Sequence, residues 1–204
     1  MTHHAAPELA PGNCTVDDVV IQWAVERERD TRSRVFRWFG TVHLADDELS
    51  SRRGHIEAYV LPEAGVSEAT ADDLDSLTQD LSMYMALCCS GRALDERIVE
   101  EYGDTVSSAL VIIDRVVLDR GVRKRGIPRL MFSELVTALP SVALVACHPH
   151  PVAGEDDPEL EGAAARKAQQ RLAQHVQAHG FVPLPRSGGL HVARADDLMR
   201  DDET

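Results

Sequence analysis

The chain has 204 residues, of which 44% are hydrophobic, and a formal net charge of −13 at pH 7. This length fits a single domain with one substantial core, and the negative charge argues against a nucleic-acid partner, which would need a basic surface. No apolar run approaches the roughly 20 residues that cross a bilayer, and the first residues do not resemble a secretory signal, so we expect a cytoplasmic protein without a membrane partner. An acidic protein attracts cations, which suits an amine substrate.

The first half of the sequence predicts three strands and then a helical region. β-branched and apolar residues separated by short polar links favour an antiparallel meander, with strands at residues 19–25, 35–44 and 55–61. Between residues 70 and 88, apolar side chains recur at three- and four-residue steps, which predicts one amphipathic helix. Asp72 and Asp73 fall in its first turn, where the helix dipole favours negative charge. A second short helix is expected at residues 94–102.

The second half predicts a strand–helix–strand unit. The nearly continuous apolar run at 109–118 indicates a strand buried on both faces. A basic loop follows, and then a helix begins near Pro128, a residue that suits the first helical turn, and ends before Pro140. Residues 142–147 form a second apolar run. A crossover helix between two strands makes those strands parallel, so we expect one parallel pair here.

The C-terminal part predicts a long helix at 163–179, stopped by Gly180, and two short closing strands. The chain therefore predicts a mixed α/β (α+β) fold, with a largely antiparallel central sheet, one parallel βαβ step, and helices on the sheet faces. The expected layout is a flexible tail at residues 1–15, one domain at 16–195, and an acidic tail at 196–204.

The loop between the predicted strand and helix near residue 120 carries the clearest chemical signal. Helix N-termini present free N–H groups and a partial positive charge, which together bind phosphate, and Gly126 permits close backbone approach. Arg123, Lys124, Arg125 and Arg129 add positive charge to a strongly acidic chain. The loop lacks the Gly-rich dinucleotide fingerprint and the Gly-Lys-Ser/Thr ending of a P-loop. It therefore predicts a different kind of phosphate site, with a solvated basic turn as the alternative.

The segment at residues 117–131 resembles the acetyl-coenzyme A motif of the GNAT superfamily of N-acetyltransferases. That motif reads Gln/Arg-x-x-Gly-x-Gly/Ala after a strand and entering a helix, and Arg123, Gly126 and Pro128 take its three defined places. Gly180-Phe181, after the last long helix, is also similar to the family. The resemblance covers residues 110–193 and implies a GNAT-like sheet.

The resemblance implies an acetyl-coenzyme A-dependent N-acetyltransferase, in which an amine attacks the thioester directly. The parallel strands would part after Leu118. Backbone groups would pair with the pantetheine arm, loop amides would hold the pyrophosphate, and basic side chains would add charge. The residues implied in these roles are Val116, Val117, Leu118, Arg123, Lys124, Arg125, Gly126 and Arg129.

Two positions depart from the family pattern and keep a rival open. Pro128 lacks the backbone N–H that the motif's last small residue would offer. Val176 stands four residues before Gly180, where the family often carries a tyrosine that protonates the leaving thiolate. These departures favour the alternative of a catalytically silent GNAT-fold protein that binds acyl-coenzyme A as a sensor or interaction module.

Glu57 and Asp114 are the candidate general bases. Each interrupts an apolar strand, and a buried carboxylate is costly unless it has a partner or a function. The alternatives are an exposed sheet-face charge for Glu57 and an ion pair with an arginine for Asp114. His148, at the exit of a predicted strand, could line the amine pocket, whereas His175 and His179 are expected to be surface or packing residues.

Metal binding is not expected. The four cysteines have no metal spacing, and His148 and His150 are two ligands without a second pair. A third kind of function, nucleophilic catalysis, would need Cys147 to meet a histidine and a carboxylate. A homodimer is possible, since the apolar strands with Trp23 and Trp38 could be either core or dimer surface.

Overall fold

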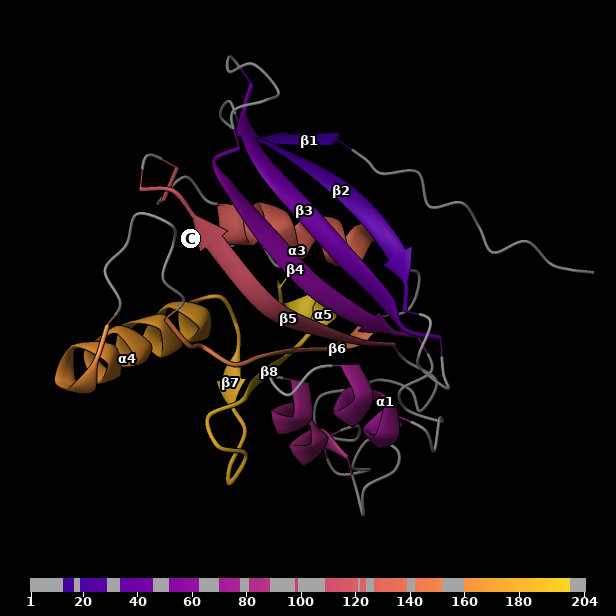
Figure 1. Ribbon diagram of the computed structural model, residues 1–204, viewed down its shortest axis with the longest axis vertical. Helices are drawn as coiled ribbons and strands as arrows, with labels where there is room; N and C mark the ends of the chain where they lie inside the picture. Colours follow the sequence, from indigo (N-terminus) through magenta and orange to yellow (C-terminus); the bar gives the residue numbers. More distant parts are fainter. Residues whose placement is uncertain are drawn as a thin grey trace, which may run out of the picture.

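The computed structural model describes residues 13–16, 19–28, 34–45, 52–62, 70–77, 81–88, 98, 109–120, 122–123, 127–138, 142–151 and 160–198. Within these residues, eight strands form one sheet in the order β1-β2-β3-β4-β5-β6-β8-β7 (Figure 1). The strands are β1 (Asn13–Val16), β2 (Val19–Arg27), β3 (Phe36–Leu44), β4 (Gly54–Leu61), β5 (Ala109–Leu118), β6 (Val142–Cys147), β7 (Val182–Pro183) and β8 (His191–Arg194).

The predicted fold class is confirmed. Strands β1 to β5 pair antiparallel with their neighbours in chain order, as the meander predicts. Helix α3 (Ile127–Ala138) crosses over between β5 and β6, and these two strands are parallel. Strand β8 then pairs antiparallel with β6, and β7 pairs with β8 at the edge. The sheet is therefore largely antiparallel with one parallel step.

Each face of the sheet is covered by a separate hydrophobic core. On one face, α3 packs on inward side chains of β2 to β6, and this core includes Trp23, Trp38, Ile56 and Met131. Both tryptophans lie in it, with exposed fractions of 5% and 4%, so they are core residues and not surface. On the other face, α1 (Thr70–Leu77) and the 3₁₀ helix η1 (Leu81–Leu87) cover part of β4, β5, β6 and β8. Figure 1 shows α1 near one end of the sheet, so the helices that the structure describes cover only part of this second face.

The single helix predicted for residues 70–88 is wrong. The structure has α1 up to Leu77, and the chain from Leu81 to Leu87 is a 3₁₀ helix. The physical reason lies in the spacing of the buried residues. Leu81, Tyr84 and Leu87 are three residues apart and fully buried, and a 3₁₀ helix with three residues per turn aligns such positions on one side. The helix predicted at 94–102 lies outside the described residues, apart from Ile98.

Two short elements lie at the ends of the described chain. Strand β1 begins at Asn13 and pairs with β2. Helix α5 (Ala195–Leu198) occupies the start of the expected acidic tail, and both of its end residues are buried. Apolar side chains at these two positions draw this segment onto the core, although Asp196 and Asp197 lie between them.

Helix α4 (Gly162–Ala178) ends where the sequence predicts. Gly180 has φ +90°, a backbone conformation that favours glycine, and its N–H donates to the Gln177 carbonyl at 3.1 Å. The helix has no buried residue, and only Val176 packs against the core from its C-terminal turn. Among the described residues, no helix is both long and apolar enough to cross a membrane.

Candidate functional site

The parallel strands β5 and β6 part in the middle of β5. Their pairing runs from Ala109 to Ile113, where Ile113 lies opposite Cys147, the last residue of β6. Strand β5 continues to Leu118 with β4 as its neighbour. We expected the parting after Leu118, and it occurs five residues earlier because β6 is the shorter strand. A β-bulge lies at the same level: Ile113 faces Ala58 and Arg115 faces Glu57, so Asp114 is the extra residue.

The direction of the backbone groups decides which residues of β5 face the opening. The Asp119 N–H donates to the Arg53 carbonyl at 2.8 Å, and a Cβ on Gly54 would lie 2.4 Å from the Val117 carbonyl oxygen. Val117 and Asp119 therefore direct their backbone groups to the β4 side. Because strand residues alternate, Val116 and Leu118 direct theirs to the opposite edge. Among the described residues, no strand pairs with that part of the edge.

This alternation changes the set of residues implied for the pantetheine arm. Val117 is turned to β4, so Val116 and Leu118 are the residues whose backbone faces the opening. The Leu118 carbonyl accepts a hydrogen bond of 2.8 Å from Nε of Arg123, an exposed residue at the start of the basic loop. Val122, just before it, is fully buried and anchors the loop. Lys124, Arg125 and Gly126 lie outside the described residues, as does the side chain of Arg129.

Tyr84 of η1 lies where the two strands part. Its hydroxyl donates to the Ile113 carbonyl at 3.3 Å, and the hydroxyl oxygen takes a backbone hydrogen bond from His148. Burial raises the pKa of Tyr84 well above its ordinary value, and the nearby Cys147 and Asp114 act in the same direction. Tyr84 thus bridges β5 and the residue that follows β6. The sequence pattern placed Tyr84 on an apolar helical face and gave no sign of the partners of its hydroxyl.

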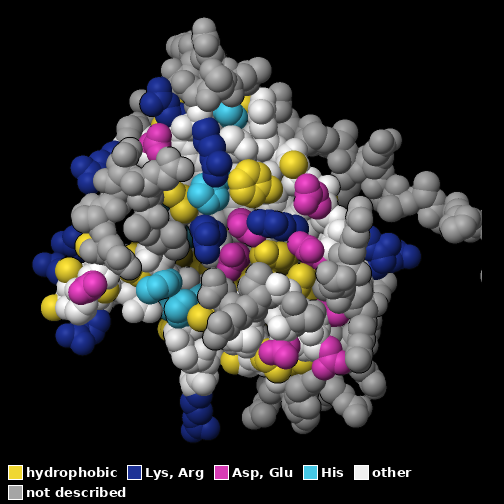
Figure 2. All heavy atoms as spheres, viewed as in Figure 1, with side chains coloured by type: hydrophobic (Ala, Val, Ile, Leu, Met, Phe, Trp, Pro, Cys, Tyr) yellow, Lys and Arg dark blue, Asp and Glu magenta, His cyan; other side chains and the backbone are white. Residues whose placement is uncertain are grey.

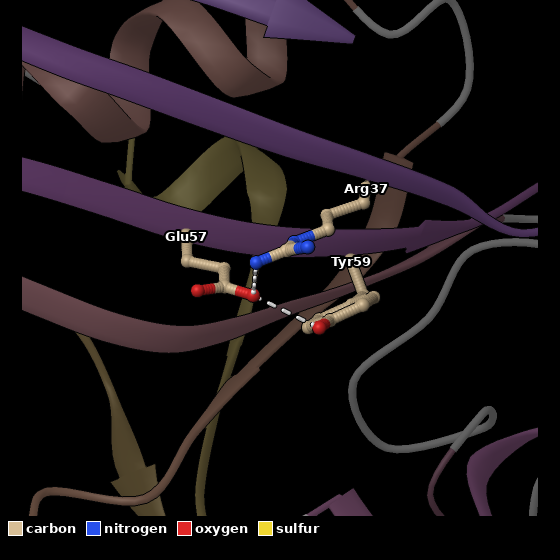
Figure 3. Close-up of polar contacts among 3 residues, drawn as sticks. All are labelled: Arg37, Glu57 and Tyr59. Carbon is tan, nitrogen blue, oxygen red and sulfur yellow. Dashed lines mark hydrogen bonds and ion pairs between the residues drawn. The ribbon is translucent and has the colours of Figure 1, made fainter. Parts of the chain in front are cut away.

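Glu57 of β4 is held by two neighbours, as Figure 3 shows. Its Oε1 accepts a hydrogen bond of 2.9 Å from the Tyr59 hydroxyl and forms an ion pair of 2.7 Å with Nη2 of Arg37. The Glu57 side chain is only 12% exposed, so the expected alternative of an exposed sheet-face charge is wrong. Burial lowers the pKa of Arg37, but the charges of Glu57 and Tyr59 and the hydrogen bond to Glu57 outweigh it and raise the pKa overall.

The charges of both candidate bases raise the pKa of Tyr59. Burial raises the pKa of Tyr59 most, its hydrogen bond to Glu57 and the Glu57 charge raise it further, and Asp114 adds to the increase. Both carboxylates therefore act on the same phenol, beside the place where β5 and β6 part. Arg37 and Tyr59 were missed in the sequence because their contact with Glu57 depends on strand register.

Around Phe39, the second sheet face carries aromatic, basic and acidic side chains. Phe39 faces Glu57 across β3 and β4, stacks on His55 with ring centroids 5.8 Å apart, and lies under the Arg52 guanidinium at 5.5 Å. Figure 2 shows basic, acidic and histidine side chains close together around hydrophobic ones in the middle of this face. Such a surface offers both charge and an aromatic wall to a small polar ligand.

His148 follows β6 directly and is half-buried. Burial lowers the pKa of His148, and His150 lowers it further, with the two rings 6.0 Å apart. A hydrogen bond with the Gly188 backbone opposes these effects, while His191 adds to them. The imidazole is therefore mainly neutral near pH 7, the form that can accept a proton.

Other candidate chemistry finds no support in the described part of the chain. No group of three or more His, Cys, Asp or Glu residues there could hold a metal ion. Cys147 is buried, and burial raises the pKa of its thiol to about 12, which opposes a role as nucleophile. His179 contacts Phe132 with ring centroids 6.4 Å apart and His175 at 4.8 Å, contacts that fit the expected packing role.

Comparisons with known proteins add little to this geometry. No model of a known protein family matches the chain, and no curated protein is significantly similar to it in sequence. Among solved structures, Arabidopsis thaliana NAA60 in complex with a bisubstrate analogue is similar, with 15% identity and a TM-score of 0.39 over 78% of this chain and 75% of that one. A likeness of this extent leaves the reaction and the substrate of this chain to be argued from its own residues.

Proposed function

We propose that this protein is an acetyl-coenzyme A-dependent N-acetyltransferase that transfers an acetyl group to a small-molecule or peptide amine. The observation that carries the proposal is the opening between β5 and β6, which lies one strand away from the buried carboxylate of Glu57. This arrangement supports the proposal, because an extended thioester arm on the free edge of β5 would lie next to a group that can accept a proton.

The edge of β5 supports binding of the pantetheine arm. That arm carries amide groups, and strand edges bind amides through backbone N–H and C=O groups. Val116 offers both groups on this edge, and Leu118 offers its N–H, because its carbonyl already accepts a hydrogen bond from Arg123. An arm bound here would bring its thioester toward the bulge at Asp114.

The start of α3 supports binding of the pyrophosphate. The loop that leads from Leu118 to Ile127 enters the helix N-terminus, where free N–H groups and the helix dipole favour anions. We assign the charge in this loop to Arg123, Lys124, Arg125 and Arg129, with the backbone of Gly126 in close approach. Pro128 occupies a position in the first turn and contributes no N–H there.

In the proposed reaction, the amine nitrogen attacks the acetyl carbon while Glu57 takes up the proton that the nitrogen loses. Asp114 is the second candidate, because it lies at the bulge and its charge raises the pKa of the same phenol. The mainly neutral His148 is placed to line the amine pocket at the end of β6.

The proposal is tested first by binding. Acetyl-coenzyme A at ~100 times its dissociation constant should stabilise the protein by about 2.7 kcal/mol in a thermal unfolding experiment. Arg123→Met should weaken this binding, whereas Arg166→Met, an exposed arginine on α4, is the matched control. If acetyl-coenzyme A and coenzyme A give no stabilisation at millimolar concentration, the proposal is wrong.

The second test is thiol release over a panel of primary amines. Transfer should release coenzyme A in proportion to the acetylated amine found by mass spectrometry. Binding without thiol release for any amine would favour the rival, a catalytically silent acyl-coenzyme A sensor. Pro128 and Val176, which depart from the family pattern, favour that rival.

A further inference from the structure

The contacts of Glu57 are unequal between its two carboxylate oxygens. Both the Tyr59 hydroxyl and Nη2 of Arg37 bind Oε1, at 2.9 and 2.7 Å. In the part of the chain that the structure describes, Oε2 takes part in neither contact, and Figure 3 shows it pointing away from both partners. One oxygen therefore anchors the group, and the other keeps its lone pairs for a further partner.

Strand register builds this arrangement. Arg37 lies opposite Tyr59, and Phe39 lies opposite Glu57, on the antiparallel strands β3 and β4. Side chains two residues apart on a strand share a face, so Glu57 and Tyr59 point the same way, and Arg37 joins them from the neighbouring strand. The carboxylate is thus held from two neighbouring strands, β3 and β4, in the middle of the sheet.

The position of the anchored group along the sheet matters as much as its contacts. Glu57 lies opposite Arg115 of β5, one residue beyond the bulge and two residues beyond the last pair that joins β5 to β6. Glu57 is therefore at the level where β5 has just left β6. A purely structural ion pair could lie anywhere on the sheet, whereas this pair lies beside the opening.

We propose that Arg37 and Tyr59 are positioning residues that fix Oε1 of Glu57 so that Oε2 accepts the proton of the attacking amine. This inference rests on the proposed acetyl transfer. In the step, the nitrogen lone pair forms the bond to the acetyl carbon, and the C–S bond breaks with its electron pair on sulfur. The proton lost by nitrogen passes to Oε2, and the thiolate takes a proton from water.

Arg37 has a second role in this arrangement. Its guanidinium lies 2.7 Å from the carboxylate and supplies a charge-assisted contact as well as orientation. A carboxylate this buried without a cation would be costly to keep charged. Tyr59 donates one hydrogen bond and has no charge to give, so its contribution is to orientation.

The experiment compares five variants in steady-state acetyl transfer, with kcat and KM measured from pH 5 to 9. Glu57→Gln should lower kcat roughly 100-fold or more, and Arg37→Met and Tyr59→Phe roughly 10-fold, with KM for acetyl-coenzyme A unchanged. Arg37→Lys keeps the charge without the planar fork, so it should restore part of kcat. Arg27→Met, an exposed arginine at the end of β2, is the control.

Stabilisation by acetyl-coenzyme A shows which variants are folded and competent to bind. If folded Arg37→Met and Tyr59→Phe keep the wild-type kcat, the inference is overturned. If Arg37→Met does not fold, Arg37→Lys and Tyr59→Phe decide the matter by the same criteria. Wild-type transfer that is insensitive to Glu57→Gln would remove this inference and leave the proposed function standing, whereas a wild type that neither binds nor transfers would remove the function itself.

Discussion

Glu134 of α3 offers a sharp test of how burial affects a carboxyl group in this protein. It is half-buried against the sheet, and one of its oxygens accepts a hydrogen bond from Nε1 of Trp23 on β2. Burial raises the pKa of Glu134 from its ordinary 4.5 to about 7. We expect Glu134→Gln to remove the cost of charging the group while keeping an oxygen that can accept the Trp23 hydrogen bond.

The sign and size follow from linkage. The pKa is higher in the folded state, so the folded protein binds the proton more tightly and loses stability as the pH rises from about 4.5 to about 7. At about 1.4 kcal/mol for each pH unit, the upper limit is about 3.4 kcal/mol. The group is only half-buried, and solvent screening reduces this to roughly 1–2 kcal/mol. Glu134→Gln should therefore be more stable than the wild type by that amount at pH 8, and the difference should vanish near pH 4.5.

Urea unfolding followed by tryptophan fluorescence measures this difference at both pH values. Glu26→Gln, which neutralises an exposed carboxylate on β2, is the control. A difference between Glu134→Gln and the wild type that is the same at pH 4.5 and pH 8 would refute the reasoning. A variant less stable than the wild type at pH 8 would refute it as well.

Three further predictions concern the sheet and its cysteines. Gly54→Val should lower the free energy of unfolding in urea by about 1–3 kcal/mol, because even a Cβ would lie 2.4 Å from the Val117 carbonyl oxygen; an unchanged midpoint would contradict the register of β4 and β5. Burial raises the pKa of Cys88 to about 11 and of Cys147 to about 12, so both thiols should be alkylated slowly at pH 8 until urea unfolds the chain. Mass spectrometry measures the labelling, and rapid labelling of the native protein would contradict this prediction. Tyr84→Phe should cost about 1–3 kcal/mol, since two buried backbone groups lose their partner, and a neutral result in the same urea assay would count against the bridge.

The architecture was readable from the sequence because strands and helices leave local patterns. The apolar runs at 109–118 and 142–147, with a helix-forming segment between them, predict a parallel pair, and the structure has it. Turn residues bound the three strands of the meander closely enough to place each within a few residues. The single helix was wrong because three-residue spacing in Leu81, Tyr84 and Leu87 fits both an α-helix and a 3₁₀ helix over so short a distance.

Only part of the candidate site could be predicted from the sequence. Glu57 could be named because a carboxylate inside an apolar strand is unusual, but its partners could not. Arg37 and Tyr59 reach it only in one register of β3 against β4, and a shift of one residue would turn Arg37 to the opposite face. The bulge at Asp114 is also hidden in the sequence, because an extra residue in a strand looks like any other. Long-range register is a property of the packed sheet.

The hydroxyl of Tyr84 also completes the backbone accounting where β5 and β6 separate. Where two paired strands separate, a carbonyl on one strand and an N–H on the other lose their ladder partners. Buried backbone groups without a hydrogen-bond partner are costly. The Tyr84 hydroxyl donates to the Ile113 carbonyl and accepts from the His148 backbone, so it replaces hydrogen bonds that the ladder would otherwise make there. Lengthening or shortening the β5–β6 pairing would break one of these two hydrogen bonds of the Tyr84 hydroxyl. Tyr84, from a distant part of the chain, therefore helps to fix the level at which β5 and β6 separate, and we expect this level to be the same with and without a bound ligand.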